Sequence, residues 1–232
     1  MYWLISIGII AVSLFLVWAS ADIGSNIYLK TICKGTMDKK FVVLTFDDGP
    51  DPDMTPLVLN VLKEYNVKAT FFLVGCKVDK YPEIVKRIIA EGHSVGNHTY
   101  SHQWNFPLGS MSETYKEVLK CNESLELHLS QRIKWFRPPF GVTNPIIGKV
   151  VKAMNLIAIG WSIRSLDTRS DRSRERVCEN IIRKLHPGAI VLLHDRCKQA
   201  DGLLRNLIQS VLGLGYTIVP LDKLIGEDDY EK

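Results

Sequence analysis

Two histidines four residues apart, His98 and His102, are the first pair of side chains in this sequence that could do chemistry. On a helical turn this spacing points both imidazoles the same way, so that they can share one metal ion. The pattern alone is weak, and no His-Glu-x-x-His run indicates a zincin-type protease. Two histidines, one carboxylate and an open position for water describe a catalytic zinc site, so a carboxylate from elsewhere must complete this one.

Two adjacent carboxylates, Asp47 and Asp48, directly follow an apolar run at residues 41–46 that predicts a buried strand. Carboxylates in such a place are costly unless something neutralises them. Their side chains diverge, so one can bind metal while the other faces the attacking water as a general base. The alternative is a solvated acidic turn, which Gly49-Pro50 makes less favourable because it fixes a tight turn.

Two other predicted strand ends carry reactive side chains. Arg137 precedes two prolines, which stiffen the backbone, and its guanidinium could pair with a buried aspartate and keep it ionised. His194 follows the apolar run at residues 189–193, which suits a small acyl pocket beside an acid that protonates a leaving amine. Each residue taken singly is also compatible with an ordinary strand end or a structural histidine.

The elements that must position these residues alternate between strands and helices. Apolar runs predict strands at residues 41–46, 69–74, 93–97, 134–137, 156–163, 189–193 and 216–219. Apolar stripes and caps predict helices that begin at Thr55-Pro56 and Asn144-Pro145, and helices near residues 84–92, 112–129, 171–185 and 203–212.

Such alternation predicts a parallel sheet covered by helices, either closed like a barrel or open and doubly wound. No Gly-x-Gly-x-x-Gly follows the first strand, so a dinucleotide site is unsupported. In a parallel barrel, active residues collect where the strands end. The reactive residues fall at those places: Asp47, Asp48, His98, His102, Arg137, Asp167 and His194.

Taken together and in this order, these residues resemble the motifs of the polysaccharide deacetylase family, also called the NodB homology domain or carbohydrate esterase family 4. The resemblance covers roughly residues 40–222 and rests on four runs: TFDDG at residues 45–49, HTYSH at 98–102, RPPF at 137–140 and LHD at 193–195. It implies an α/β fold, a distorted (β/α)7 barrel. The activity that it implies is removal of acetyl groups from an N-acetylated carbohydrate such as peptidoglycan, a chitin-like oligomer or another cell-surface glycan.

The resemblance also implies a divalent metal, most commonly zinc, with cobalt, manganese or nickel as alternatives. It assigns Asp48, His98 and His102 as the metal ligands and Asp47 as the general base.

Five further roles follow from the same resemblance. Arg137 would orient the base, and the backbone N–H of Phe140 would help to hold the oxyanion. Leu192 would line the acetyl pocket. His194 would be the general acid, tuned by the carboxylate of Asp167.

The fourth motif departs from the family pattern, in which Asp-x-x-Asp-Trp often follows a Trp. Here Arg164 stands at the first Asp after Trp161, and Thr168 stands at the final Trp, while Asp167 keeps the second carboxylate. We therefore expect substrate preference to differ at this loop. Arg164 also begins a basic stretch that continues to Arg176, which we interpret as a solvated helix face, with contact to an anionic glycan or lipid headgroups as the alternative.

The N-terminal segment, residues 2–20, is uncharged and would be roughly 28 Å long as a helix, enough to cross a hydrocarbon core. Ala19-Ser20-Ala21 resembles a signal-peptide cleavage site, but no Lys or Arg precedes the apolar run, which favours an uncleaved anchor. The nearest basic residues lie on its C-terminal side, and taken alone they place the domain in the cytoplasm. The substrate class points the other way, and we favour a catalytic domain that faces the periplasm or cell exterior, or is secreted after cleavage.

The predicted organisation is an anchor or signal segment at residues 1–21, a connector at 22–40, a deacetylase domain at 41–222 and a polar tail at 223–232. A net charge of +4 over 232 residues is too weak to indicate a nucleic-acid partner. The expected partners are the N-acetylated carbohydrate and, through the N-terminal helix, a membrane. Alternatives are an O-deacetylase or deformylase acting on another sugar or lipid-linked sugar, and a non-catalytic glycan-binding pseudoenzyme.

Overall fold

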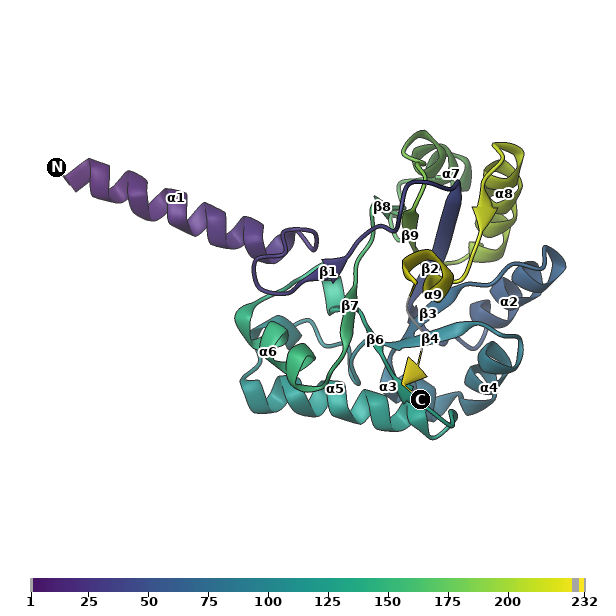
Figure 1. Ribbon diagram of the computed structural model, residues 1–232, viewed down its shortest axis with the longest axis horizontal. Helices are drawn as coiled ribbons and strands as arrows, with labels where there is room; N and C mark the ends of the chain where they lie inside the picture. Colours follow the sequence, from purple (N-terminus) through teal and green to yellow (C-terminus); the bar gives the residue numbers. More distant parts are fainter. Residues whose placement is uncertain (1, 227–229, 232) are drawn as a thin grey trace.

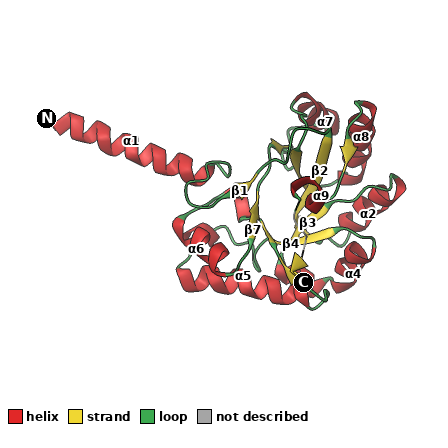
Figure 2. Cartoon of the chain, in the orientation of Figure 1, coloured by secondary structure: helices red, strands yellow, loops and turns green. Residues whose placement is uncertain are grey.

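The computed structural model describes residues 2–226 and 230–231, and at its centre is a curled sheet of parallel strands (Figure 1). Among the described residues nine strands pair in the order β1-β7-β6-β4-β3-β2-β9-β8, with β10 beside the start of β2. They are β1 (Thr31–Ile32), β2 (Phe41–Gly49), β3 (Thr70–Leu73), β4 (Ser94–Asn97), β6 (Trp135–Phe136), β7 (Ile157–Ile159), β8 (Ile163–Arg164), β9 (Ala189–His194) and β10 (Thr217–Ile218). Helices surround this sheet on its outside (Figure 2), which confirms the distorted (β/α)7 barrel.

The outer helices occupy the connections between strands. They are α2 (Met54–Glu64), α3 (Gly75–Lys80), α4 (Pro82–Ala90), α5 (Met111–Glu126), α6 (Pro145–Ala153), α7 (Arg174–Arg183) and α8 (Ala200–Gly213). The capping predicted for α6 is confirmed, because the Asn144 side chain accepts a hydrogen bond from the N–H of Ile147. Helix α3 was not expected from the sequence, since it is a single short turn and a half without a long apolar stripe.

The start predicted for α2 is wrong. Thr55 does not cap it: the helix begins at Met54, and the carboxylate of Asp51 accepts hydrogen bonds from the N–H groups of Asp53 and Met54. The Thr55 hydroxyl is instead committed to other partners, because it accepts from the N–H of Asp51 and donates to Asp195.

The single strand predicted at residues 156–163 is also wrong. The chain forms β7, leaves the sheet at residues 160–162, and re-enters it as β8, which pairs with β9 on the opposite edge. Gly160 is needed at this crossing, since a Cβ there would lie 2.6 Å from the sulfur of Cys33. The chain thus crosses the barrel from β7, the neighbour of edge strand β1, to edge strand β8.

Alternation along the strands divides the core into two parts. On β2, Val42, Leu44 and Phe46 pack outward with the helices, while Val43 packs inward. The inner cluster comprises Val43, Phe72, Trp135, Ile159, Ile190, Val219, Leu221 and Leu224. Because side chains alternate, the next inward positions on β2 are Thr45 and Asp47. The carboxylate of Asp47 therefore points into the barrel near the carboxyl end of this buried strand.

The predicted connector, residues 22–40, packs against the domain, because β1 pairs with β7 and Ile23 is buried. The predicted polar tail, residues 223–232, begins inside helix α9 (Leu221–Ile225), which lies in front of β2 in Figure 1 and buries Leu224. Strand β11 (Tyr230–Glu231) pairs antiparallel with β5 (Arg132–Ile133). Residues 227–229 and 232 of that predicted tail lie outside the described residues.

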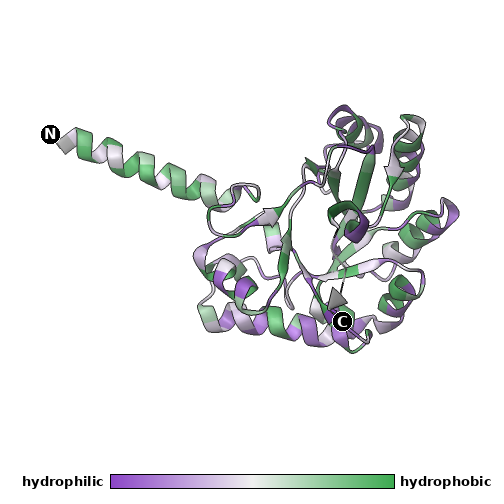
Figure 3. Cartoon of the chain, in the orientation of Figure 1, coloured by the Kyte–Doolittle hydropathy of each residue, from purple (hydrophilic) through white to green (hydrophobic). Residues whose placement is uncertain are grey.

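Helix α1 (Tyr2–Ala21) projects away from the barrel and is hydrophobic along nearly its whole length (Figure 3). Its segment Trp3–Ala21 is long and apolar enough to cross a membrane, a test that a signal sequence also passes. The last turn of the helix packs against the domain, because Ala19 is fully buried.

Candidate active site

The three predicted metal ligands converge. Oδ1 of Asp48 lies 3.5 Å from Nε2 of His98 and 3.3 Å from Nε2 of His102, and the three ligand atoms all lie within 4.8 Å of one another. Zinc bonds of ~2.0–2.1 Å place neighbouring ligand atoms about 3.3–3.4 Å apart in a tetrahedron. Two imidazole nitrogens and one carboxylate oxygen at these separations therefore fit a divalent metal with an open position.

The two histidines do not share a helical turn, contrary to the expectation from their spacing. They lie in the loop after β4, where Thr99 and His102 adopt left-handed backbone conformations with φ of 65° and 49°. The N–H of Thr99 donates to Oδ1 of Asn97, and the N–H of His102 donates to the Thr99 hydroxyl. Hydrogen bonds within this loop, and not a helical turn, thus bring the two imidazoles together.

Hydrogen bonds fix which ring nitrogens face the metal position. Nδ1 of His98 lies 2.7 Å from the carbonyl oxygen of Arg137, so it donates its proton there and leaves Nε2 free to bind metal. Burial, and then the charge of His98, lower the pKa of His102 to about 4, which keeps its imidazole neutral. Burial of Asp48 opposes its ionisation, but its neighbours His98, His102 and His194 outweigh burial and hold its pKa below its usual range. Neutral imidazoles and a carboxylate are the forms that bind metal.

Asp47 is held apart from the metal ligands by Arg137. Nη1 of Arg137 donates to Oδ1 of Asp47 at 2.7 Å, while Oδ2 of Asp47 lies 3.9 Å from Nε2 of His98. The guanidinium is fully buried. It also donates hydrogen bonds to the Thr45 hydroxyl and to the carbonyls of Ile159 and Gly160. One oxygen of Asp47 is therefore anchored, and the other faces the metal position.

His194 and Asp167 form a second pair in the same cavity. Nδ1 of His194 lies 2.8 Å from Oδ1 of Asp167, and the backbone N–H of His194 donates to Oδ2 of Asp167 at 2.7 Å. Burial disfavours the charged imidazole, but the hydrogen bond and charge of Asp167 outweigh burial and raise the pKa of His194. His194 is also the register partner of Asp47 on the adjacent strand, so an imidazole and a carboxylate lie side by side.

Phe140 lies in the short turn Pro139–Gly141 with a left-handed φ of 62°, and its ring centroid is 4.9 Å from that of His102. Gly141 follows with φ of 72°, and a Cβ there would lie 2.5 Å from the ring of Trp161. The turn therefore depends on a glycine that lets the tryptophan close one wall of the cavity.

These elements enclose a cavity of about 170 Å³. Its lining residues are Asp47, Asp48, His98, His102, Phe140, Gly141, Trp161, Arg164, Thr168, Leu192, His194 and Arg196. A groove of about 490 Å³ adjoins it and shares Asp48, His102, Phe140 and Arg196 with it. Arg137 and Asp167 hold the lining side chains from behind, so all nine predicted site residues are brought together.

Two contacts were missed from the sequence. Nε of Arg196 donates to Oδ2 of Asp48 at 2.7 Å, which leaves Oδ1 for the metal position, and Nζ of Lys77 donates to the Asp48 carbonyl. The position of Arg196 two residues beyond His194 was the available signal. Asp195, between them, is fully buried and hydrogen-bonded to Thr55 outside the cavity, and burial raises its pKa to about 7.

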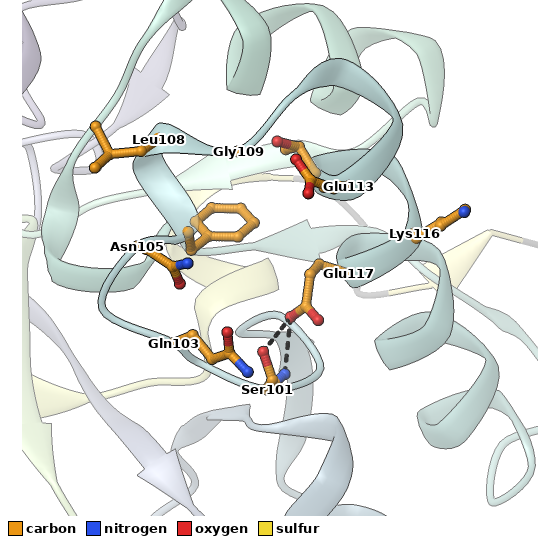
Figure 4. A pocket seen from close by; sticks show the side chains of 10 residues that line it. Ser101, Gln103, Asn105, Leu108, Gly109, Glu113, Lys116 and Glu117 are labelled. Carbon is orange, nitrogen blue, oxygen red and sulfur yellow. Dashed lines mark hydrogen bonds between the residues drawn. The ribbon is translucent and has the colours of Figure 1, made fainter.

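The histidine loop is also supported from outside the cavity. Oε2 of Glu117 accepts hydrogen bonds from both the N–H and the hydroxyl of Ser101, each at 2.8 Å (Figure 4). These residues line a separate pocket of about 400 Å³ between the loop and helix α5. A carboxylate on a long helix thus fixes the loop next to His102.

Comparisons with known proteins agree with this arrangement. A model of the polysaccharide deacetylase family matches residues 34–159. A peptidoglycan-N-acetylglucosamine deacetylase of Bacillus cereus is 39% identical over 160 residues, 69% of this chain and 58% of that protein. A chitooligosaccharide deacetylase of Bradyrhizobium sp. is 35% identical over 199 residues, 79% of this chain and 90% of that protein.

A solved structure shows the same likeness in three dimensions. The crystal structure of the Bc1960 peptidoglycan N-acetylglucosamine deacetylase has a TM-score of 0.82 and 33% sequence identity, over 87% of this chain and 95% of that chain. The present chain thus spans a little over half the length of the Bacillus cereus relative and nearly all of the solved domain.

Proposed function

This chain belongs to the polysaccharide deacetylase family, and on that premise we propose that it is a metal-dependent hydrolase that removes acetyl groups from an N-acetylated glycan. The observation that carries the proposal is the division of labour between two neighbouring carboxylates. Asp48 turns one oxygen to two imidazoles, while Asp47 is withheld from the metal position by Arg137. A site built only to bind a metal or a glycan has no need of a carboxylate held back in this way.

Asp48, His98 and His102 would hold a divalent metal, which would polarise the acetyl carbonyl and lower the pKa of a water molecule. We propose zinc, because two imidazoles and one carboxylate with an open position are typical of catalytic zinc sites. Asp47 accepts the proton of the attacking water with the oxygen that faces the cavity. The ion pair with Arg137 keeps this carboxylate in place.

The remaining residues act on the oxyanion, the departing amine and the methyl group of the substrate. The backbone N–H of Phe140 donates to the oxygen that becomes negative as water adds to the carbonyl carbon. His194, held protonated by Asp167, donates a proton to the departing amine nitrogen as the carbon–nitrogen bond breaks. Leu192 lines the space for the methyl group. The products are acetate and a free amino sugar.

The substrate that the relatives' names support is an oligosaccharide of N-acetylglucosamine, from peptidoglycan or chitin. Acetate release from peptidoglycan, chitin oligomers and acetylxylan tests the activity and separates N- from O-deacetylation. Acetate from acetylxylan alone would make the chain an O-deacetylase, and formate from a formamido sugar alone would make it a deformylase. A pseudoenzyme would bind metal and glycan and release neither acid.

We further propose that α1 stays attached as a membrane anchor, with the catalytic domain outside the cytoplasmic membrane. The contacts of its last turn support this. The N–H of Thr143 donates to the carbonyl of Ser20, and the hydroxyls of Thr143 and Ser25 donate to the carbonyl of Ala19. The segment resembling a cleavage site is thus helical and hydrogen-bonded to Thr143, which lies two residues after the turn that carries Phe140. Protease accessibility on intact cells tests the orientation, which would be contradicted by protection until permeabilisation.

A further inference from the structure

Of the arginines at the cavity, two are paired with carboxylates and a third, in the described part of the chain, is not. Arg137 is paired with Asp47, and Arg196 is paired with Asp48, each at 2.7 Å. Arg164 also lines the cavity, at the end of edge strand β8. Within residues 2–226 and 230–231 its guanidinium has neither an ion-pair nor a hydrogen-bonding partner, and its side chain is exposed. One arginine with five free donors therefore faces the site.

The position of Arg164 relative to the reacting groups is fixed by the sheet. It is the register partner of Leu192, which lines the same cavity two residues before His194. The chain after it turns through Ser165, whose buried hydroxyl donates to Asp167, so the segment is tied to the acid pair. Arg164 thus stands at a defined place beside the proposed acetyl pocket.

Resting on the proposed function, we propose that Arg164 binds an acidic group, a carboxylate or a phosphate, that the substrate carries beside the N-acetyl group. Neutral acetamide hydrolysis needs no third arginine at the cavity. A guanidinium pairs with planar carboxylate or with phosphate through two parallel hydrogen bonds, which gives both attraction and orientation. The exposed Thr168, which lines the cavity on the same loop, leaves room at this rim for the group.

Matched saccharides that differ by one acidic group test the inference. The first pair is a disaccharide of N-acetylglucosamine and N-acetylmuramic acid and its methyl ester. The second pair is N-acetylglucosamine 1-phosphate and methyl N-acetylglucosaminide. Binding is measured by calorimetry in an Asp47→Asn background, which separates recognition from turnover, and kcat/KM for acetate release is measured in the otherwise unchanged enzyme.

We expect the acidic member of at least one pair to bind roughly ten- to a hundredfold more tightly than its neutral partner, the range of a charge-assisted hydrogen bond. The pair that shows the preference identifies carboxylate or phosphate as the recognised group. Arg164→Gln should remove the preference, and Arg164→Lys should keep part of it, since the charge remains but the bidentate geometry is lost. High salt should weaken it.

Arg176→Gln is the matched control, because it removes one exposed positive charge from helix α7 outside the cavity and should leave the preference intact. Equal binding of both members of both pairs to the wild-type site would overturn the inference, as would a preference that survives Arg164→Gln. Either result with acetate still released leaves the proposed function standing. Absence of acetate from every N-acetylated saccharide, with metal bound, would instead count against the proposed function.

Discussion

Arg137 and Asp47 form a buried ion pair, with Nη1 of the arginine 2.7 Å from Oδ1 of the aspartate and the arginine side chain wholly excluded from solvent. The same arginine offers its backbone carbonyl to Nδ1 of His98. One residue therefore orients the proposed base through its side chain and a proposed metal ligand through its main chain. The face of Phe72 covers the guanidinium at 4.1 Å, which seals the pair from the barrel interior.

Replacing Arg137 by methionine should destabilise the fold by about 3–5 kcal/mol, because the charge of Asp47 would be left buried and unpaired. Denaturant unfolding of the variant and the wild type measures this difference. Arg205→Met, which breaks the exposed ion pair with Glu64 on the surface, should change stability little by comparison. Adding Asp47→Asn to Arg137→Met should recover part of the loss, and a strictly additive double variant would contradict the coupling.

Asp47→Asn and His98→Ala should fail in different ways. Asp47→Asn should lose turnover by on the order of 10²–10⁴-fold while it still binds metal, because it removes the proton acceptor and no ligand. His98→Ala should lose metal first, because it removes one of three ligand atoms. Metal content after dialysis, measured by elemental analysis, separates the two, and His128→Ala is the control. Parallel loss of metal in Asp47→Asn would refute its assignment as base.

The pH dependence of kcat should report on His194 and Asp167. The hydrogen bond and charge of Asp167 raise the pKa of His194, so the protonated acid persists to higher pH, and kcat falls as pH rises through that pKa. Asp167→Asn removes the charge and weakens the hydrogen bond, whereas burial, which acts in the opposite direction, remains. The alkaline limb of the kcat profile should therefore move to lower pH in Asp167→Asn, and a limb that stays in place would exclude His194 as the titrating acid.

Cutting the chain after Ala21 should weaken the domain, whereas cutting it after residue 15 should not. The longer deletion removes the buried Ala19 and the carbonyls that accept hydrogen bonds from Thr143, which is 1% exposed. Leaving that buried N–H unpaired costs about 1–3 kcal/mol. Unfolding of both shortened chains measures the difference, and equal stability would show that α1 is only a tether.

The sequence predicted most strands and helices because their apolar periodicity is local and strong. Strand β2 and helix α6 lie where their patterns placed them, and α6 uses its expected Asn144 cap. The continuous apolar run at residues 156–163 led to the wrong prediction of one strand, since a buried crossing segment and a buried strand have the same composition. The difference lies in Gly160, whose close approach to Cys33 depends on a segment more than 100 residues away in the chain.

The site was predictable in its residue types and less so in its geometry. His98 and His102 were identified from a spacing typical of a helix, although loop contacts from Asn97 and Glu117 bring their rings together. Arg196 was missed because its position two residues beyond His194 places it near the site but does not indicate that its partner is Asp48 on β2. Its contact with Asp48 exists only because β9 and β2 are neighbours in the sheet.

Acetate release from a peptidoglycan or chitin oligomer during titration of zinc into chelator-treated protein tests the central claim most directly. We expect no release above background without metal, and release that rises with zinc and saturates near one equivalent per chain. Release that persists after the metal is removed would contradict metal-dependent deacetylation. So would protein that holds one equivalent of zinc and releases no acetate from any N-acetylated glycan.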